Sequence, residues 1–147
     1  MKTSGMIKLT IESRLENVAL IGGSVRGIAE MLSIDAIGGY QLELCVVEAV
    51  TNVIKHAYHF ESGHSVDVEI HVQRERLIFK ICDTGESMDE SKIAPLQFDP
   101  LKVETLPEGG MGVFILKSLM DEVGYEVKNG RNILTMSKAL KTREHAE

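Results

Sequence analysis

Five segments of the chain alternate between apolar and polar residues, the pattern of a strand that is buried on one side. They comprise residues 6–12, 65–73, 76–83, 124–128 and 132–138. Arg74 and Glu75 separate the second segment from the third, and a Lys-Asn-Gly-Arg turn at 128–131 separates the last two. Short polar turns between alternating runs indicate β-hairpins, so we predict two antiparallel hairpins and a separate N-terminal strand.

Three other segments have the 3.6-residue spacing of amphipathic helices: residues 14–32, 40–59 and 113–123. Gly22 and Gly23 interrupt the first of these. Each glycine costs a helix about 1 kcal/mol relative to alanine, so we expect the pair to serve close packing or a local bend. The order of elements predicts an α+β fold: a two-layer α/β sandwich with a mixed, mostly antiparallel sheet and its helices on one face.

Composition limits the class of protein. A chain of 147 residues, 44% hydrophobic and 26% charged, is expected to form one domain over 1–147, with a charged tail at 140–147 that frays. The net charge of −6 argues against a nucleic-acid surface. With no signal peptide and no apolar run of about 18 residues, we expect a cytoplasmic protein that does not insert into membranes. Cys45 and Cys82 lie in apolar runs and are expected to be reduced core thiols.

The second helix carries a polar face within the segment EAVTNVIKH. Glu48, Asn52, Lys55 and His56 fall within an arc of roughly 100° at 100° per residue. Asparagine is a poor helix former, so its place one turn after a glutamate suggests that both side chains address something specific. Their oxygens suit Mg²⁺ and the lysine suits phosphate. The alternative is a polar helix face with one incidental asparagine.

A second candidate motif, DTGESMD at 83–89, follows directly on the strand 76–83. The carboxylate of Asp83 emerges at the strand end, where it could accept a hydrogen bond from the exocyclic amine of adenine. Gly85 removes a side chain where the backbone must turn or approach a ligand closely. The alternative is an ordinary turn that ends the strand, because Asp-x-Gly is typical turn chemistry.

Residues 84–108 have little periodicity and contain all three prolines, which suggests a functional lid or disorder, with the lid at about 84–111. Seven acidic residues against two lysines between Asp83 and Glu108 mean that a nucleotide there would need a metal ion and backbone donors. Gly109, Gly110 and Gly112 open the next helix, where exposed N–H groups can hold phosphate; a simple loop end is the alternative. Thr135, on the last strand, would matter only if it neighbours Asp83.

Taken in order, EAVTNVIKHAY, DTGESMD and GGMGVFILKSLMDEV resemble the ATP-binding module of gyrase B, Hsp90, histidine kinases and MutL, the GHKL superfamily with the Bergerat fold. The resemblance covers about residues 8–138. Within the superfamily the chain is most similar to the anti-sigma-factor serine/threonine kinases of bacterial stress response and sporulation. Three motifs at the family's intervals are far more specific than any one of them.

The resemblance implies ATP and Mg²⁺ as cofactors and a role for each candidate residue. Glu48 would be the general base and Asn52 the Mg²⁺ ligand, while Lys55 and His56 would approach the phosphates. Asp83 would read the adenine amine with support from Thr135, and the glycines at 85, 109, 110 and 112 would shape the pocket and lid. Relatives often carry arginines where this chain has Gly22 and Pro107, which leaves Arg14 and Arg26 as first-helix candidates.

By the same resemblance the protein would sequester a sigma factor or similar regulator, phosphorylate a Ser or Thr on a STAS-type antagonist, and form a homodimer. The alternative is an ATP-gated partner-switching protein with little or no kinase activity. Missing arginines favour that alternative, and the presence of Glu48 disfavours it. A histidine kinase would need an upstream phospho-accepting helix pair, and a gyrase- or MutL-type ATPase would need a transducer domain; we expect neither.

Overall fold

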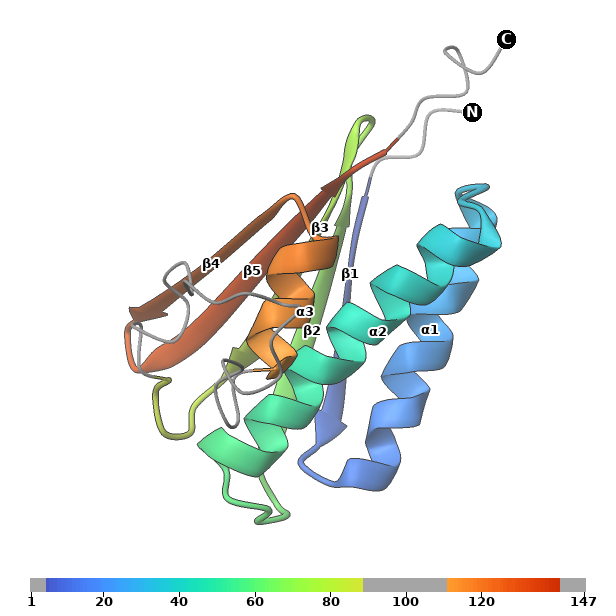
Figure 1. The fold of residues 1–147 in the computed structure, drawn as a ribbon. Coiled ribbons are helices and arrows are strands. Elements are labelled where there is room, and N and C mark those ends of the chain that lie inside the picture. Colours follow the sequence, from blue (N-terminus) through green and yellow to red (C-terminus); the bar gives the residue numbers. More distant parts are fainter. Residues whose placement is uncertain (1–4, 89–110, 141–147) are drawn as a thin grey trace, which may run out of the picture.

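A computed structural model describes residues 5–88 and 111–140, with the backbone alone described at 111–114. Five strands form one sheet in the order β1-β2-β3-β5-β4 (Figure 1). Their bounds are β1 Gly5–Glu12, β2 Ser65–Val72, β3 Arg76–Asp83, β4 Glu122–Lys128 and β5 Arg131–Ala139. All four pairings are antiparallel. The expected sandwich is confirmed, but the sheet is antiparallel throughout the described residues rather than mixed.

The helices lie on one face of this sheet, as Figure 1 shows. They are α1 (Val18–Met31), preceded by a 3₁₀ turn at Leu15–Asn17, α2 (Ala36–Asn52), which continues as a π-helical turn over Val53–Ala57, and α3 (Met111–Leu119). Helix α3 packs beside α2, and α1 packs on the other side of α2. Among the described residues, none of these helices has the length and apolar character needed to cross a membrane.

Element boundaries differ from the sequence-based expectation at two places. Helix α2 begins at Ala36 rather than at the expected residue 40, because the Asp35 side chain accepts a 2.7 Å hydrogen bond from the Gly38 N–H and caps the helix. Helix α3 ends at Leu119 rather than near residue 123, and β4 begins at Glu122 rather than at 124. The tail beyond residue 140 and the expected lid from residue 89 to 110 lie outside the described residues.

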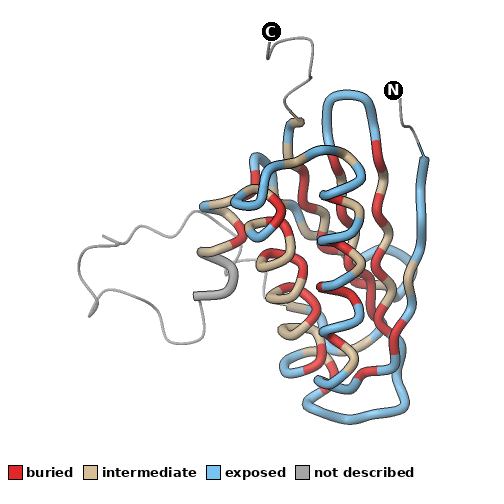
Figure 2. The backbone as a smooth tube through the Cα atoms, turned by 90° about the vertical axis from the view of Figure 1, so that its right-hand side faces the viewer, coloured by how far each residue is buried: buried red, intermediate tan, exposed pale blue. Residues whose placement is uncertain are grey.

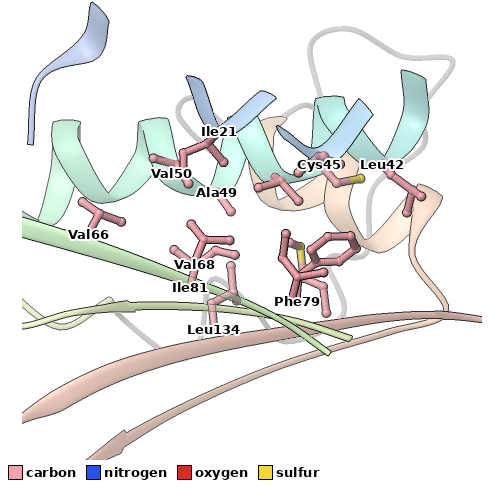
Figure 3. Close-up of a cluster of buried hydrophobic side chains, with 14 of the residues drawn as sticks. Ile21, Leu42, Cys45, Ala49, Val50, Val66, Val68, Phe79, Ile81 and Leu134 are labelled. Atoms are coloured by element: carbon pink, nitrogen blue, oxygen red, sulfur yellow. The ribbon is translucent and has the colours of Figure 1, made fainter. Parts of the chain in front are cut away.

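The core lies between the two layers. Alternate residues of β2 and β3 face the helices and are buried, including Val68, Phe79 and Ile81 (Figure 3). They meet the buried side of α2, while the outer surfaces of the helices stay exposed (Figure 2). Cys45 and Cys82 are both free and buried, and burial raises the pKa of Cys45 to about 11. The expectation of unpaired, buried thiols is therefore confirmed.

Gly22 allows α1 and α2 to approach closely. A Cβ atom at this position would lie 3.2 Å from Cγ2 of Val47 and 3.4 Å from Oε1 of Glu43, both on α2. Gly23 has no such neighbour within 4 Å and is exposed. Helix α1 runs through both glycines, so Gly22 serves packing, as expected, and Gly23 does not.

Two adjacent residues of α1 provide a test of which helix face carries the stability. Ile21 is 2% exposed and Leu20 is 66% exposed. Ile21→Ala should lower the free energy of unfolding by about 2–5 kcal/mol, because it removes buried methyl groups and leaves a cavity. Leu20→Ala is the matched control and should change it by no more than about 0.5 kcal/mol. Urea denaturation measures both, and equal losses would contradict the assignment of faces.

Candidate functional site

The four polar residues predicted for one helix face divide between two elements: α2 carries Glu48 and Asn52, and the π-helical turn after it carries Lys55 and His56. Glu48 and Asn52 are half-buried one turn apart, and Lys55 and His56 are exposed. None of these four side chains makes a hydrogen bond or an ion pair with any other described residue. The described residues also contain no cluster of three or more His, Cys, Asp or Glu side chains that could hold a metal. Asn52 offers one carboxamide oxygen on this helix, and Mg²⁺ bound together with phosphates usually takes only one or two oxygens from the protein.

A π-helical turn ends this helix and changes the predicted spacing. The Tyr58 N–H donates to the Val53 carbonyl, five residues back, at 3.0 Å. The spacing of 100° per residue that placed Lys55 and His56 in one arc with Glu48 therefore does not apply beyond Asn52. Such turns are frequent at functional sites. Here the turn directs Ala57 toward the segment that follows β3.

A backbone hydrogen bond joins the segment after β3 to this turn. The N–H of Glu86 donates to the carbonyl of Ala57 at 2.9 Å. A Cβ on Gly85 would lie 2.5 Å from that same carbonyl oxygen, so only glycine fits without a shift. The sequence predicted a turn or a close approach to a ligand at Gly85, and in the structure the close neighbour is the backbone of Ala57.

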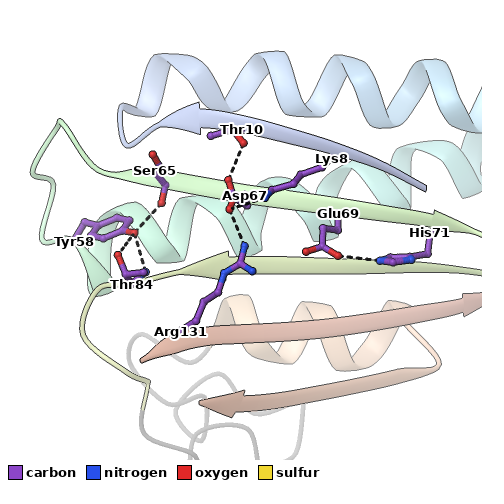
Figure 4. Close-up of polar contacts among 9 residues, drawn as sticks. All are labelled: Lys8, Thr10, Tyr58, Ser65, Asp67, Glu69, His71, Thr84 and Arg131. Carbon is purple, nitrogen blue, oxygen red and sulfur yellow. Dashed lines mark hydrogen bonds and ion pairs between the residues drawn. The ribbon is translucent and has the colours of Figure 1, made fainter. Parts of the chain in front are cut away.

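Tyr58 adds a second connection between the same two segments. Its hydroxyl accepts a hydrogen bond from the Thr84 N–H at 2.9 Å and donates to the Ser65 carbonyl at 2.8 Å (Figure 4). The ring of His64 stacks on Tyr58 with centroids 4.5 Å apart. The end of α2, the start of β2 and the end of β3 are thereby held together.

Asp83 ends β3 as a buried carboxylate, 6% exposed, on the side of the sheet that faces the helices. Its Oδ1 accepts from the Gly85 N–H at 2.9 Å and from Nδ2 of Asn132 at 2.8 Å. Burial raises the pKa of Asp83 above its ordinary value, and the two hydrogen bonds act in the opposite direction. Within the described residues its Oδ2 accepts no hydrogen bond.

Asn132, not Thr135, is the β5 residue beside Asp83. In the β3–β5 register Asp83 pairs with Asn132, whereas Thr135 pairs with Lys80. Because strand residues alternate between faces, Thr135 points to the helix-free side, away from Asp83. The condition set for Thr135 is therefore not met. A signal for Asn132 was available, since it shares its parity with the apolar residues Leu134 and Met136, and a polar residue at a core position needs partners.

The remaining predicted residues have mixed placements. Gly112 is the second residue of α3, and Gly109 and Gly110 lie outside the described residues. The two first-helix arginine candidates are engaged in ion pairs. Arg14 contacts Glu12 at 2.8 Å, and Arg26 contacts Glu43 at 3.2 Å.

The close approach at Gly85 generates a prediction about local stability. Gly85→Ala should lower the free energy of unfolding by about 1–3 kcal/mol, because the added methyl group would overlap the Ala57 carbonyl. The Glu86 amide should then exchange faster with deuterium, since its acceptor is displaced. Gly124→Ala on β4 is the matched control; its Cβ would meet nothing within 4 Å, so both measurements should stay near wild type. Slow Glu86 exchange in Gly85→Ala would contradict the assignment.

A second prediction concerns the charge on Asp83. Its raised pKa means that the ionised carboxylate destabilises the fold, a cost that is absent well below the ordinary pKa of 3.8 and grows as the pH rises through the folded-state pKa. Asp83→Asn removes this charge and keeps an acceptor for Asn132 and Gly85. Its free energy of unfolding relative to wild type should therefore rise from about pH 4 to a plateau near neutral pH. Urea denaturation across this range checks the trend, and a difference independent of pH would refute it.

Comparison with known proteins shows which family this chain resembles in sequence. Residues 11–138 match the model of the histidine kinase-like ATPase domain. The chain is 30% identical over 142 residues to the serine-protein kinase RsbW of Halalkalibacterium halodurans, covering 94% of this chain and 85% of that protein. It is also 30% identical over 143 residues to RsbW of Staphylococcus aureus, covering 94% and 89%.

Solved structures agree on the fold. The RsbU and RsbW domains of a Mycobacterium tuberculosis protein superpose with a TM-score of 0.66 at 12% identity, over 95% of this chain and 34% of that chain. The SiaB–SiaC complex of Pseudomonas aeruginosa gives 0.64 at 12% identity, over 90% and 88%. Sequence match, fold and the order of the motifs lead to one conclusion: the chain belongs to the histidine kinase-like ATPase domain family.

Proposed function

We propose that this protein binds Mg·ATP where the end of α2 meets the segment after β3, and acts as an anti-sigma regulatory factor with serine/threonine kinase activity. The observation that carries the proposal is the Glu86–Ala57 hydrogen bond, 2.9 Å long. It fixes Asp83, which can accept from a base amine, relative to the helix that bears Asn52, Lys55 and His56. Base recognition and phosphate binding are thereby parts of one rigid junction.

Each side chain has a role that its chemistry supports. Asp83 would accept a hydrogen bond from the adenine amine, Asn52 would supply an oxygen to Mg²⁺, and Lys55 and His56 would approach the phosphates. Glu48 acts as general base toward the hydroxyl of the incoming Ser or Thr. Bound Mg²⁺ would neutralise the charge that develops on the transferred phosphoryl group. Gly109, Gly110 and Gly112 would contribute backbone donors from the lid and the start of α3.

The protein partners follow from the relatives. Two of them are named serine-protein kinase RsbW at 30% identity, which supports a protein Ser or Thr as acceptor. The similarity to SiaB in its complex with SiaC supports the binding of a second protein. We propose a STAS-type antagonist as substrate and a sigma factor or similar regulator as the sequestered partner. A homodimer stays a prediction.

A second candidate is an ATP-gated binding protein with little or no phosphoryl transfer. The observation that favours it is the engagement of both first-helix arginines, Arg14 with Glu12 and Arg26 with Glu43. Neither guanidinium is free to reach a phosphate without leaving its partner. The two candidates share the nucleotide site and differ only in transfer.

Two variants of α2 separate binding from transfer. Calorimetry of the wild type with Mg·ATP and Mg·GTP should show micromolar-range binding of ATP alone. Asn52→Ala should abolish Mg·ATP binding, because the metal loses its protein oxygen. Glu48→Gln should keep binding and lose transfer to a STAS-type antagonist by about 10²–10⁴-fold, the usual contribution of a general base. Mass spectrometry of the antagonist measures transfer.

Glu30→Gln, at an exposed position on α1, is the control and should match the wild type in both assays. Normal Mg·ATP binding by Asn52→Ala would remove the metal assignment, and wild-type transfer by Glu48→Gln would remove the base. Binding by wild type without transfer to any antagonist would favour the second candidate. No binding at millimolar ATP would overturn the proposal.

A further inference from the structure

Asn132 uses every polar group of its side chain within one small network. Its Nδ2 donates to Oδ1 of Asp83 at 2.8 Å and to the Gly85 carbonyl at 3.0 Å, and its Oδ1 accepts from Oγ of Ser87 at 2.7 Å. The residue is 2% exposed. One carboxamide on β5 therefore connects to three residues at and beyond the end of β3. A buried amide with both donors and its acceptor satisfied is a rigid support.

We propose that Asn132 is a positioning residue for base recognition, which decides which oxygen of Asp83 meets the nucleotide and so sets the preference for adenine. This inference rests on the nucleotide site proposed above and adds a determinant that the sequence motifs did not contain. It concerns specificity, whereas the roles of Glu48 and Asn52 concern metal binding and transfer.

The two carboxylate oxygens of Asp83 have different surroundings. Oδ1 already accepts from Asn132 and from the Gly85 N–H, and Oδ2 accepts nothing among the described residues. The carboxylate torsion is broad and twofold when nothing restrains it. With Oδ1 held from both sides, Asp83 presents Oδ2 as a single acceptor in a defined direction.

Oδ2 of Asp83 can distinguish between purine bases by their hydrogen-bonding groups. An ionised carboxylate has no donor. It can accept from the amine on C6 of adenine, whereas guanine carries an oxygen acceptor at C6. Two facing acceptors repel, so a fixed Oδ2 favours adenine, and a carboxylate free to rotate would discriminate less. The hydrogen bond from Asn132 should therefore affect the ratio of the affinities for ATP and GTP as well as the affinity for ATP itself.

Asn132 is itself held in place by contacts of its strand with the rest of the sheet. Its neighbour Arg131 reaches across β3 on the helix-free face and contacts Asp67 of β2 at 2.7 Å (Figure 4). Asp67 also receives a 2.7 Å hydrogen bond from Thr10 of β1. The start of β5 is thus anchored to β2 on one face of the sheet, while Asn132 holds Asp83 on the other. Asn132 is positioned by strand pairing and not by a loop.

The experiment compares two substitutions of Asn132 with a control on the same strand. Asn132→Ala removes all three hydrogen bonds, and Asn132→Leu removes them while filling the volume, which keeps the test available if the alanine variant does not fold. Ser137→Ala is the control, because Ser137 is also buried on β5 and its Oγ has no hydrogen-bond partner in the part of the chain that the structure describes. Calorimetry with Mg·ATP and Mg·GTP gives the affinities, and carbon-13 NMR of the side-chain carboxyl gives the pKa of Asp83 in the nucleotide-free protein.

We expect either Asn132 variant to lose about tenfold or more in ATP affinity, the usual effect of removing a hydrogen bond to a charged group, and to show a smaller ATP-to-GTP preference. The pKa of Asp83 should rise further in these variants. Burial raises this pKa and the hydrogen bonds from Asn132 and Gly85 lower it, so losing the bond from Asn132 leaves the effect of burial less opposed. Ser137→Ala should stay within about twofold of wild type. Variants that fold and keep both the wild-type preference and the wild-type pKa of Asp83 would overturn the inference.

The nucleotide-free titration keeps this inference separate from the proposed function. If the wild type binds no nucleotide, the proposed function fails. The Asp83 titration then still shows whether Asn132 holds the carboxylate. If the wild type binds Mg·ATP and the Asn132 variants bind with an unchanged ratio, the proposed function stands and the inference fails.

Discussion

The carbonyl of Ala57 accepts the N–H of Glu86 at 2.9 Å, and this backbone contact joins the two halves of the candidate site. It depends on the π-helical turn at Val53–Ala57, which directs the carbonyl away from the helix ladder, and on Gly85, where any side chain would overlap it. This contact holds the turn that ends the helix against the segment that follows β3. A ligand that touches both elements therefore meets a preformed arrangement, which reduces the ordering cost of binding.

Sequence periodicity predicted the layers and motifs because both follow from local spacing. The strand 76–83, the position of Asp83 at its end and the burial of Cys45 needed no knowledge of distant contacts. Asn132 was missed because its place beside Asp83 depends on the register between β3 and β5, which are separated in sequence by residues 84–130. The π-helical turn was missed because its five-residue hydrogen bond has no counterpart in the apolar pattern. The spacing of apolar residues along the sequence contains no information on strand register or on local helix distortion.

Close packing of α1 against α2 depends on the absence of a side chain at Gly22. A Cβ there would begin 3.2 Å from Cγ2 of Val47 and 3.4 Å from Oε1 of Glu43, so a larger residue would require these two side chains to shift by a few tenths of an ångström. Arg26 pairs with Glu43 across the same interface. Glu43 therefore takes part both in the close contact at Gly22 and in the ion pair between the two helices.

The chain contains three tyrosines and no tryptophan, and two of the tyrosines hold the segment after β3 through their hydroxyls. Tyr58 accepts from the Thr84 N–H at 2.9 Å, and Tyr125 accepts from the Met88 N–H at 2.8 Å. The third, Tyr40, is 58% exposed at the start of α2. Phenol emission responds to hydrogen bonding and is not obscured here by indole. The intrinsic ultraviolet fluorescence of this protein is therefore a label-free optical probe of the segment that follows β3.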